Sequence, residues 1–395
     1  MTTHTSQKNI HPLLITAAYY LSFIILGFAT AADGPSLPTL ARHTASALNQ
    51  ISLIFVFGSL GYLFGSFFGG RMYDRLPGHR FMAVMLLVLA VAAIFIPLAS
   101  SLWILILAVL VAGFSKGALD VGCNTLLQWV HGEKVGPFMN GLHFFFGIGS
   151  FLAPVLLAQI IQATHEIYWV FWTISLGALP IAIWIWLLPE PPMHTHAEKQ
   201  DHSTMPLLPV SLIVLAFVLY VGAEVGFANW IYTYATKLNL ADSVTAAYLN
   251  SAFWGSFTIG RLLGVWISTR SKSRTILFTD LAGCVLSLSL ILIGRESATA
   301  LWIGSMGLGL SMASIFPTTM ILAGEHLRIT GTITGWFLVG SSVGGMLLPW
   351  LIGEAFTLVG PYAMMVIILV DIVLNWLTLL YFAYAKRTTV AAIAS

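Results

Sequence analysis

The chain has 395 residues, of which 58% are hydrophobic and 8% are charged, and its formal net charge is +2 at pH 7. Soluble domains carry roughly 25% charged residues, so this composition excludes a soluble globular protein and predicts a protein embedded in the lipid bilayer. The basic residues form no dense block, and we therefore expect no nucleic-acid partner. The two cysteines, Cys123 and Cys284, lie in apolar runs and argue against a disulfide framework or a zinc cluster.

Apolar runs fill almost the whole chain, and about 20 apolar residues suffice for a helix to cross the hydrocarbon core. Polar or Gly/Pro segments separate runs near residues 13–40, 50–71, 81–99, 102–130, 136–163, 168–189, 207–235, 245–269, 275–294, 299–324, 330–356 and 361–385. The sequence thus predicts an all-α integral membrane protein with twelve transmembrane helices.

The polar stretch PEPPMHTHAEKQDHSTMP divides these runs into two sets of six. We expect an N-terminal six-helix bundle at 1–189, a linker at 190–206 and a C-terminal six-helix bundle at 207–395. A spacing of 195 residues pairs Gly149 with Gly344 and Pro154 with Pro349, which favours two pseudo-symmetric bundles. The linker histidines, His194, His196 and His202, are interpreted as part of a flexible polar loop and not as a metal site.

Basic residues in the predicted loops indicate the orientation. The side of the odd-to-even connections holds Arg42, Lys237 and Arg295, whereas the side of the linker and both termini holds twelve lysines and arginines. By the positive-inside rule, both termini and the linker are expected to be cytoplasmic.

Three polar residues in the fourth predicted helix, Lys116, Asp120 and Asn124, are spaced four apart and therefore share one helix face. A charge at the bilayer centre costs at least about 2.5–3.5 kcal/mol on insertion scales, so this face must meet a partner or water. Lys116 and Asp120 can instead form a structural pair one turn apart. Asn124 can hydrogen-bond a sugar hydroxyl or a neighbouring helix.

Other polar and aromatic residues in the apolar runs are candidates for cation coupling or substrate binding. Asp33 precedes Gly34-Pro35, where a helix is expected to break, and Glu224 stands between two glycines of the seventh run. Candidate sugar contacts are Asn140, His143, Trp230, Asn250, Trp254 and Trp336, because amides and histidine read hydroxyls and tryptophan stacks on a pyranose. Interface anchoring is an equal alternative for Trp230. Arg261 either neutralises a carboxylate or lies at a cytoplasmic helix end, and the second is favoured.

Between the second and third runs stands GGRMYDRLPGHR. It resembles the cytoplasmic signature of the major facilitator superfamily, with one extra residue before Gly78. Its charged residues are Arg71, Asp74, Arg75 and Arg80, which can tie two helices together in one conformation and thereby gate transport. Ordinary positive-inside anchoring is the alternative.

The segments ALDVGCN and GPFMNGLHFFFGIGSFLAP resemble the fucose, galactose and glucose symporter family, and within it the sodium-dependent glucose transporter branch. AEVGFANW and FWGSFTIGRLLG match the patterns of that branch in the seventh and eighth spans. The resemblance implies that Asp120 acts in cation coupling and that Asp33 corresponds to a second acidic position. Lys116 has no counterpart carried over from the proton-coupled members, which leaves the coupling ion open.

We therefore expect a secondary active transporter, not an enzyme, that couples Na⁺ or H⁺ to symport of a neutral hexose such as glucose by alternating access. No cofactor beyond the coupling ion is expected, and no nucleotide-binding loop of the G-x-x-x-x-G-K type occurs. The expected setting is a monomer in a bacterial inner membrane. Alternatives are a proton-coupled exporter of drugs or metabolites, or a sugar sensor without transport.

Overall fold

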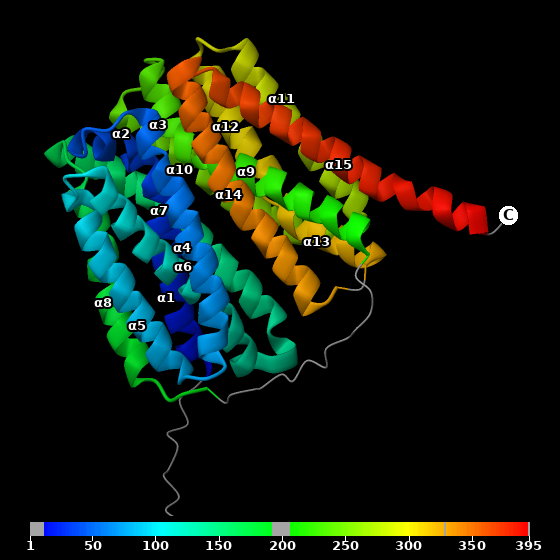
Figure 1. The fold of residues 1–395 in the computed structure, drawn as a ribbon, viewed down its shortest axis with the longest axis horizontal. Coiled ribbons are helices and arrows are strands. Elements are labelled where there is room, and N and C mark those ends of the chain that lie inside the picture. The colour runs from blue at the N-terminus through cyan, green and yellow to red at the C-terminus, as the bar shows by residue number, and fades with distance from the viewer. Residues whose placement is uncertain (1–11, 192–205, 328, 394–395) are drawn as a thin grey trace, which may run out of the picture.

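A computed structural model describes residues 12–191, 206–327 and 329–393, and side chains up to Tyr384. The linker histidines and most of the predicted linker lie outside the described residues. Within them every regular element is a helix (Figure 1). The helices are α1 (Pro12–Ala31), α2 (Asp33–His43), α3 (Leu48–Ile51), α4 (Leu53–Tyr73), α5 (Gly78–Phe95), η1 (Ile96–Leu98), α6 (Leu102–His131), η2 (Gly132–Lys134), α7 (Gly136–Thr164), α8 (Tyr168–Leu187), α9 (Leu207–Lys237), α10 (Ser243–Ser268), α11 (Ser273–Ile293), α12 (Ala298–Met312), α13 (Ile315–His326), α14 (Gly331–Leu358) and α15 (Ala363–Ile393).

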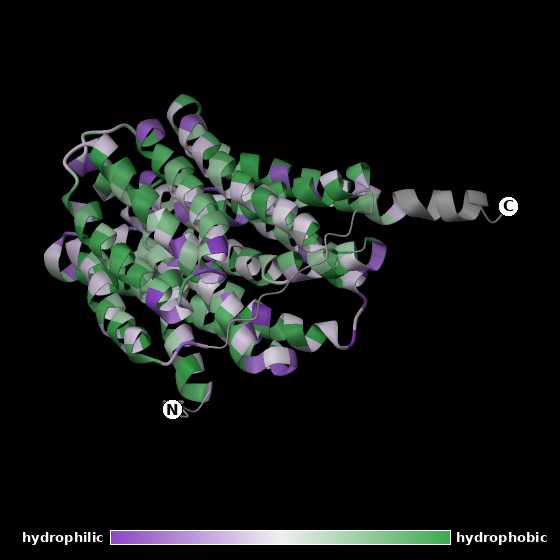
Figure 2. Ribbon diagram, turned by 60° about the horizontal axis from the view of Figure 1, so that its bottom comes forward, coloured by the Kyte–Doolittle hydropathy of each residue, from purple (hydrophilic) through white to green (hydrophobic). Residues whose placement is uncertain are grey.

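The predicted all-α membrane fold is confirmed. In the described ranges, eleven helical segments are long and apolar enough to cross a membrane. The remaining crossing is α10, the eighth in chain order, whose 26 residues include Asn250, Thr258 and Arg261 and are therefore less apolar. Figure 2 shows hydrophobic residues over most of the helix surfaces and hydrophilic ones mainly at helix ends and loops. Apolar side chains such as Trp103 and Ile293 are strongly exposed, as expected where helices meet lipid.

Helix packing repeats between the two halves of the chain. In the first half α1 packs on α7, α4 on α6 and α5 on α8, and in the second half α9 packs on α14, α10 on α12 and α11 on α15. Counted as membrane crossings within each half, the first packs on the fifth, the second on the fourth and the third on the sixth in both cases. The repeat explains the glycine spacing found in the sequence, because Gly149 and Gly344 occupy matching crossings.

Both glycines bring two helix backbones into contact. A Cβ atom at Gly149 would lie 2.0 Å from the carbonyl oxygen of Ile24 in α1, and one at Gly344 would lie 2.0 Å from that of Val218 in α9. No side chain fits in this space, and small residues are what allow membrane helices to approach so closely. Each half is therefore built around a direct backbone contact between its first and fifth crossings.

The two halves touch along α7 and α10 as far as Gly147 and Thr258, toward the middle of these helices, and three further contacts join them at one end of the molecule. Asn49 donates to Glu354 at 3.4 Å, Gly34 of α2 lies against the backbone of Asn229, and Gln159 of α7 hydrogen-bonds Tyr248 of α10. The residues of these three contacts all lie near the α2 ends of their helices, opposite the ends that adjoin residues 191 and 206. At the opposite ends, the early turns of α7 and α14 are exposed. The halves thus close on the α2 side and separate toward the linker side.

The glycine contacts lead to a stability prediction. Gly344→Ala should lower the free energy of unfolding by about 1–3 kcal/mol, the usual cost of overpacking, because its methyl group meets a carbonyl of α9. The apparent Tm of the detergent-solubilised protein measures the effect. Gly335→Ala in the same helix is the matched control: nothing lies within 4 Å of its added Cβ, so the gain in helix propensity should leave its Tm equal or higher. Equal losses in both variants would contradict the packing role.

Candidate functional site

An ion pair at membrane depth joins α2 to α6. The Lys116 ammonium nitrogen donates to a carboxylate oxygen of Asp33 at 3.0 Å, and the two side chains are only 11% and 19% exposed. Asp33 opens α2 directly after the break that follows α1, where the helix dipole favours a carboxylate. Lys116 therefore points away from Asp120, although both lie on one face of α6, and the structural pair considered for Lys116 and Asp120 is not formed.

Asp120 has neutral hydrogen-bond partners. The Tyr62 hydroxyl of α4 donates to one carboxylate oxygen, and the Asn124 amide donates to the other at 2.9 Å and to the Asp120 carbonyl at 2.9 Å. The three ion pairs formed among the described residues do not include Asp120. This half-buried carboxylate thus lacks the basic neighbour that Asp33 has. The Asn124 donor group is used by Asp120, while its amide oxygen is left for another group.

The second half holds a comparable cluster around Glu224 of α9. Tyr220 lies within hydrogen-bonding reach of Glu224 and donates its hydroxyl to the Met312 carbonyl at 2.9 Å. The charge of Arg261 in α10 acts on Glu224, and its guanidinium lies 4.7 Å from the centre of the Phe257 ring. α10 continues beyond Arg261 to Ser268. Arg261 thus lies about two turns before the end of α10, near enough for its charge to influence Glu224, although the two side chains form no ion pair among the described residues.

His143 of α7 lies near the second of these clusters. Its ring meets Phe23 of α1 edge-on at 5.8 Å, and it lies within electrostatic range of Arg261 across the two halves. Its side chain is exposed, as is that of Asn140 one turn earlier. Trp336, near the start of α14, is 49% exposed. These three residues lie toward the separated ends of the halves, where a solute entering from the linker side can meet them.

Three predicted sugar contacts are packed into the protein. Trp230 is fully buried, donates its indole N–H to the Pro349 carbonyl at 2.8 Å and stacks on Phe356. Asn250 is fully buried and donates to the Ala228 carbonyl at 2.5 Å. Trp254 is buried against Phe253 and Phe257. In this conformation none of the three presents a face to a solute, and Trp230 joins α9 to α14 instead of anchoring the chain at a membrane surface.

The turn between α4 and α5 is held by a residue that the sequence motif does not contain. Glu190, beyond the end of α8, accepts from the backbone N–H groups of His79 at 2.9 Å and Arg80 at 3.4 Å, and the Arg80 side chain lies 4.0 Å from it. Arg71 donates to the Phe67 carbonyl at 3.1 Å. Asp74 and Arg75 are exposed, and among the described residues no ion pair includes Asp74. The predicted tie through Asp74 is therefore not made in this conformation.

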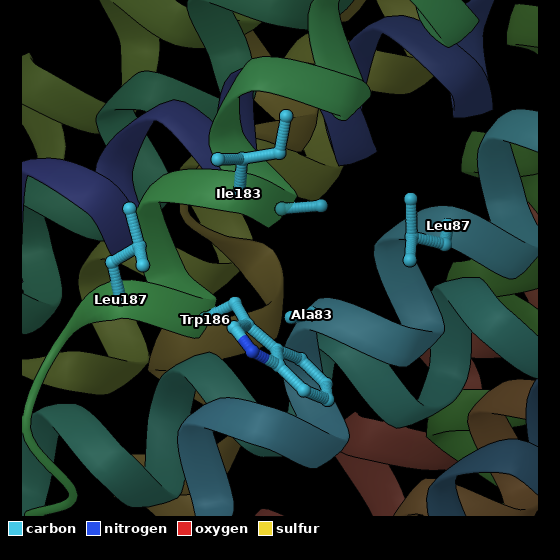
Figure 3. Close-up of a pocket in the computed structure, with 6 residues that line it drawn as sticks. Ala83, Leu87, Ile183, Trp186 and Leu187 are labelled. Atoms are coloured by element: carbon cyan, nitrogen blue, oxygen red, sulfur yellow. The ribbon is translucent and has the colours of Figure 1, made fainter.

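A shallow hollow on the outer surface, between α5 and α8, is lined by apolar residues alone (Figure 3). Its lining residues are Ala83, Leu87, Ala182, Ile183, Trp186 and Leu187. Apart from the indole N–H of Trp186, its lining side chains are hydrocarbon, which suits contact with lipid better than recognition of a sugar or an ion. Among the described residues no group of three or more His, Cys, Asp or Glu side chains is arranged to hold a metal ion.

Three candidate site residues were not found by sequence analysis: Tyr62, Tyr220 and Glu190. Each tyrosine stands in an apolar run, where aromatic residues are common, and Glu190 reaches its partner across 111 residues of sequence. A spacing pattern within one helix reveals none of these contacts. The available signal was the presence of Asp120 and Glu224 in apolar helices. A carboxylate in such surroundings needs hydrogen-bond donors, which other helices can supply.

Residues 19–349 match the Major Facilitator Superfamily. Sodium-dependent glucose transporter 1A of Mus musculus is 27% identical over 373 residues, which cover 85% of this chain and 88% of that protein. Major facilitator superfamily domain-containing protein 4A of Homo sapiens is 25% identical over 461 aligned positions, covering 91% and 89%.

Solved structures share the fold. A mutant of the nucleoside transporter NupG superposes with a TM-score of 0.76 at 14% identity, covering 94% of this chain and 98% of that one. The inward open xylose transporter XylE from E. coli gives a TM-score of 0.74 at 12% identity, covering 93% and 96%. The functions named among these proteins are transport and not catalysis. The match to residues 19–349, together with the twelve-crossing fold, places the chain in the major facilitator superfamily.

Proposed function

We propose that the protein is a secondary active transporter that couples Na⁺ or H⁺ to symport of a neutral hexose such as glucose. The observation that carries the proposal is the state of Asp120. It is a carboxylate in a membrane-spanning helix whose partners are the neutral Tyr62 and Asn124, while the nearby ammonium of Lys116 is held by Asp33. A carboxylate at this depth needs a cation or a proton.

Either coupling ion fits this arrangement chemically. The Asp120 carboxylate, the Asn124 amide oxygen and the Tyr62 hydroxyl supply oxygen atoms, which are the ligands that hard cations prefer. Protonation of Asp120 removes the same charge. In both cases the bound ion lowers the free-energy cost of enclosing Asp120 when the halves close around the sugar. Ion and sugar therefore favour the same closed conformation, and each raises the affinity for the other.

The substrate assignment rests on the relatives and on the exposed polar groups. The relatives that are named sodium-dependent glucose transporters support a sugar as cargo. His143, Asn140 and the amide oxygen of Asn124 offer hydrogen bonds without a fixed charge of their own, which suits a neutral polyol. Trp336 offers a stacking face.

We further propose that residues 1–189 and 207–395 move as two bundles about the site in a monomer, with the linker at 190–206 and both termini in the cytoplasm. The basic residues on the linker side support this orientation. The conformation described above, closed on the α2 side, is then open to the cytoplasm. The bacterial inner membrane is the proposed location.

Asp120→Asn tests the coupling role. The variant keeps the shape of the side chain and removes its charge, so gradient-driven accumulation of hexose should fall to simple equilibration while exchange of labelled hexose across the membrane is partly retained. Uptake into proteoliposomes, with Na⁺ and pH gradients imposed separately, measures both. Glu133→Gln, an exposed residue between α6 and α7, is the control and should accumulate normally. Wild-type accumulation by Asp120→Asn would refute the assignment.

The same assay separates the alternative functions. A sugar sensor would bind hexose but show neither accumulation nor exchange in the wild type. A proton-coupled exporter would move apolar compounds against a proton gradient and leave hexose untouched.

His143→Ala tests substrate binding. Loss of one hydrogen bond to the sugar, worth about 1.4 kcal/mol, should raise the KM for hexose roughly tenfold. His165→Asn is a matched control, because His165 is also exposed on α7 but at its far end, where its left-handed backbone (φ 58°) suits asparagine. An unchanged KM for His143→Ala would remove this residue from the binding site.

Single introduced cysteines test the orientation. The native Cys123 and Cys284 are fully buried, so an impermeant maleimide should report only the new thiol. In intact cells Glu166→Cys, on the α2 side, should be labelled, whereas Lys134→Cys, on the linker side, should react only after permeabilisation. The reverse pattern would show that the orientation is inverted.

A further inference from the structure

We infer that the Lys116 ammonium is a built-in cation that replaces a mobile one at Asp33, and that it thereby fixes the transported cation at one per sugar. This inference rests on the proposed function. It assigns a stoichiometry-determining role to a residue that neither contacts Asp120 nor belongs to the proposed sugar contacts.

The first step is to count the carboxylates of the two clusters. The helices that form the two clusters carry three acidic residues at membrane depth: Asp33, Asp120 and Glu224. Asp33 has Lys116 at 3.0 Å, and Glu224 has the charge of Arg261 acting on it from within the same half. Asp120 has no basic partner among the described residues. Two basic side chains therefore stand against three carboxylates: Lys116 in direct contact with Asp33, and Arg261 near Glu224 without an ion pair.

The other acidic residues in the spans do not enter this balance. Glu354 accepts from Asn49 between the halves, but it lies near the end of α14, which ends at Leu358. Glu325 lies at the exposed end of α13.

Asp280 and Asp371 lie in α11 and α15, which pack on helices of the second half. Asp280 accepts from Ser314 of the same half at 2.5 Å. Asp371 is buried within that half. Neither residue belongs to the surfaces that separate and close between the halves.

The second step is electrostatic. Enclosing a net charge in a low-dielectric interior is costly, whereas a hydrogen-bonded pair of opposite charges has a much smaller net field. With two positive charges set against three negative ones, the site carries one uncompensated negative charge, at Asp120. One Na⁺ or one H⁺ then makes the closed carrier neutral, and a second cation would leave it positive.

The third step concerns competition at Asp33. A mobile cation must be drawn from solution, but the Lys116 ammonium is attached to the protein and always beside its partner, which gives it a large effective concentration. Its hydrogen bond to Asp33 occupies the carboxylate that a second Na⁺ would use. Removing this ammonium leaves Asp33 as a second unbalanced carboxylate at the point where α2 meets α9.

The experiment measures stoichiometry in proteoliposomes from the driving force that balances a fixed hexose gradient. For one cation per sugar, a tenfold hexose gradient balances about 59 mV of cation electrochemical potential, and for two it balances about 30 mV. The wild type should give one. Lys116→Met, which keeps the length of the side chain and removes its charge, should give two, whether Na⁺ or H⁺ supplies the second charge. Lys134→Met, at an exposed lysine, should stay at one.

The double variant Asp33→Asn/Lys116→Met provides the decisive control, because it removes both members of the pair. It should return to one cation per sugar. If Lys116→Met alone is not folded or not active, the double variant should restore folding and uptake, since the unbalanced carboxylate is gone, and failure to restore them would overturn the inference.

The outcomes separate this inference from the proposed function. A wild type with no cation dependence contradicts the proposed coupling itself. A wild type coupled to one cation, with Lys116→Met also coupled to one, leaves symport intact and overturns only the role of Lys116. A wild-type value of two overturns it as well.

Discussion

The contact between Lys116 and Asp33 decides what the neighbouring polar groups are free to do. A lysine at membrane depth must find an acceptor, and the candidates in this half of the molecule are Asp33 and Asp120. Because the ammonium bonds Asp33, the break between α1 and α2 is fastened to α6 and Asp120 is left to hydroxyl and amide donors. Had the Lys116 ammonium instead bonded Asp120, one turn farther along α6, the charge of Asp120 would be neutralised permanently and no other cation would be needed there.

The two halves share a plan but differ in their charges. In each, a tyrosine from a membrane helix meets the central carboxylate, Tyr62 with Asp120 and Tyr220 with Glu224. Only the second half adds a guanidinium close to that carboxylate. The duplicated architecture thus supplies equivalent positions, and the side chains placed on them leave the carboxylate of one half with neutral partners and that of the other near an arginine. His143 of the first half lies within electrostatic reach of Arg261 in the second.

Much of the fold was predictable because hydropathy and helix length are local properties. The twelve crossings, the polar face of α6 and the matched glycines Gly149 and Gly344 all follow from spacing along the chain. The partner of Lys116 did not, because Asp120 is one turn away in sequence whereas Asp33 is 83 residues away, and only tertiary packing decides between them. The burial of Trp230 was not predictable for the same reason: its indole N–H donates to the carbonyl of Pro349 in α14, and no pattern within α9 specifies that partner. Apolar helices and close-packed glycines could be located from the sequence, because each has a single strong physical requirement. The hydrogen-bond partners of Lys116 and Trp230 could not, because several acceptors were available to each.

The glycine contacts within each half have a mechanical consequence. Where backbone lies directly on backbone, as at Gly149 on Ile24 and Gly344 on Val218, there is no layer of side chains that can shear or change rotamers. Between the halves, Gly34 also lies against the backbone of Asn229, but the hydrogen bonds there are made by side chains such as Gln159, Tyr248 and Asn49, which can exchange their partners for water. Each half is therefore stiffer than the boundary between them, so a rearrangement of that boundary moves each half as one body across the full height of the membrane.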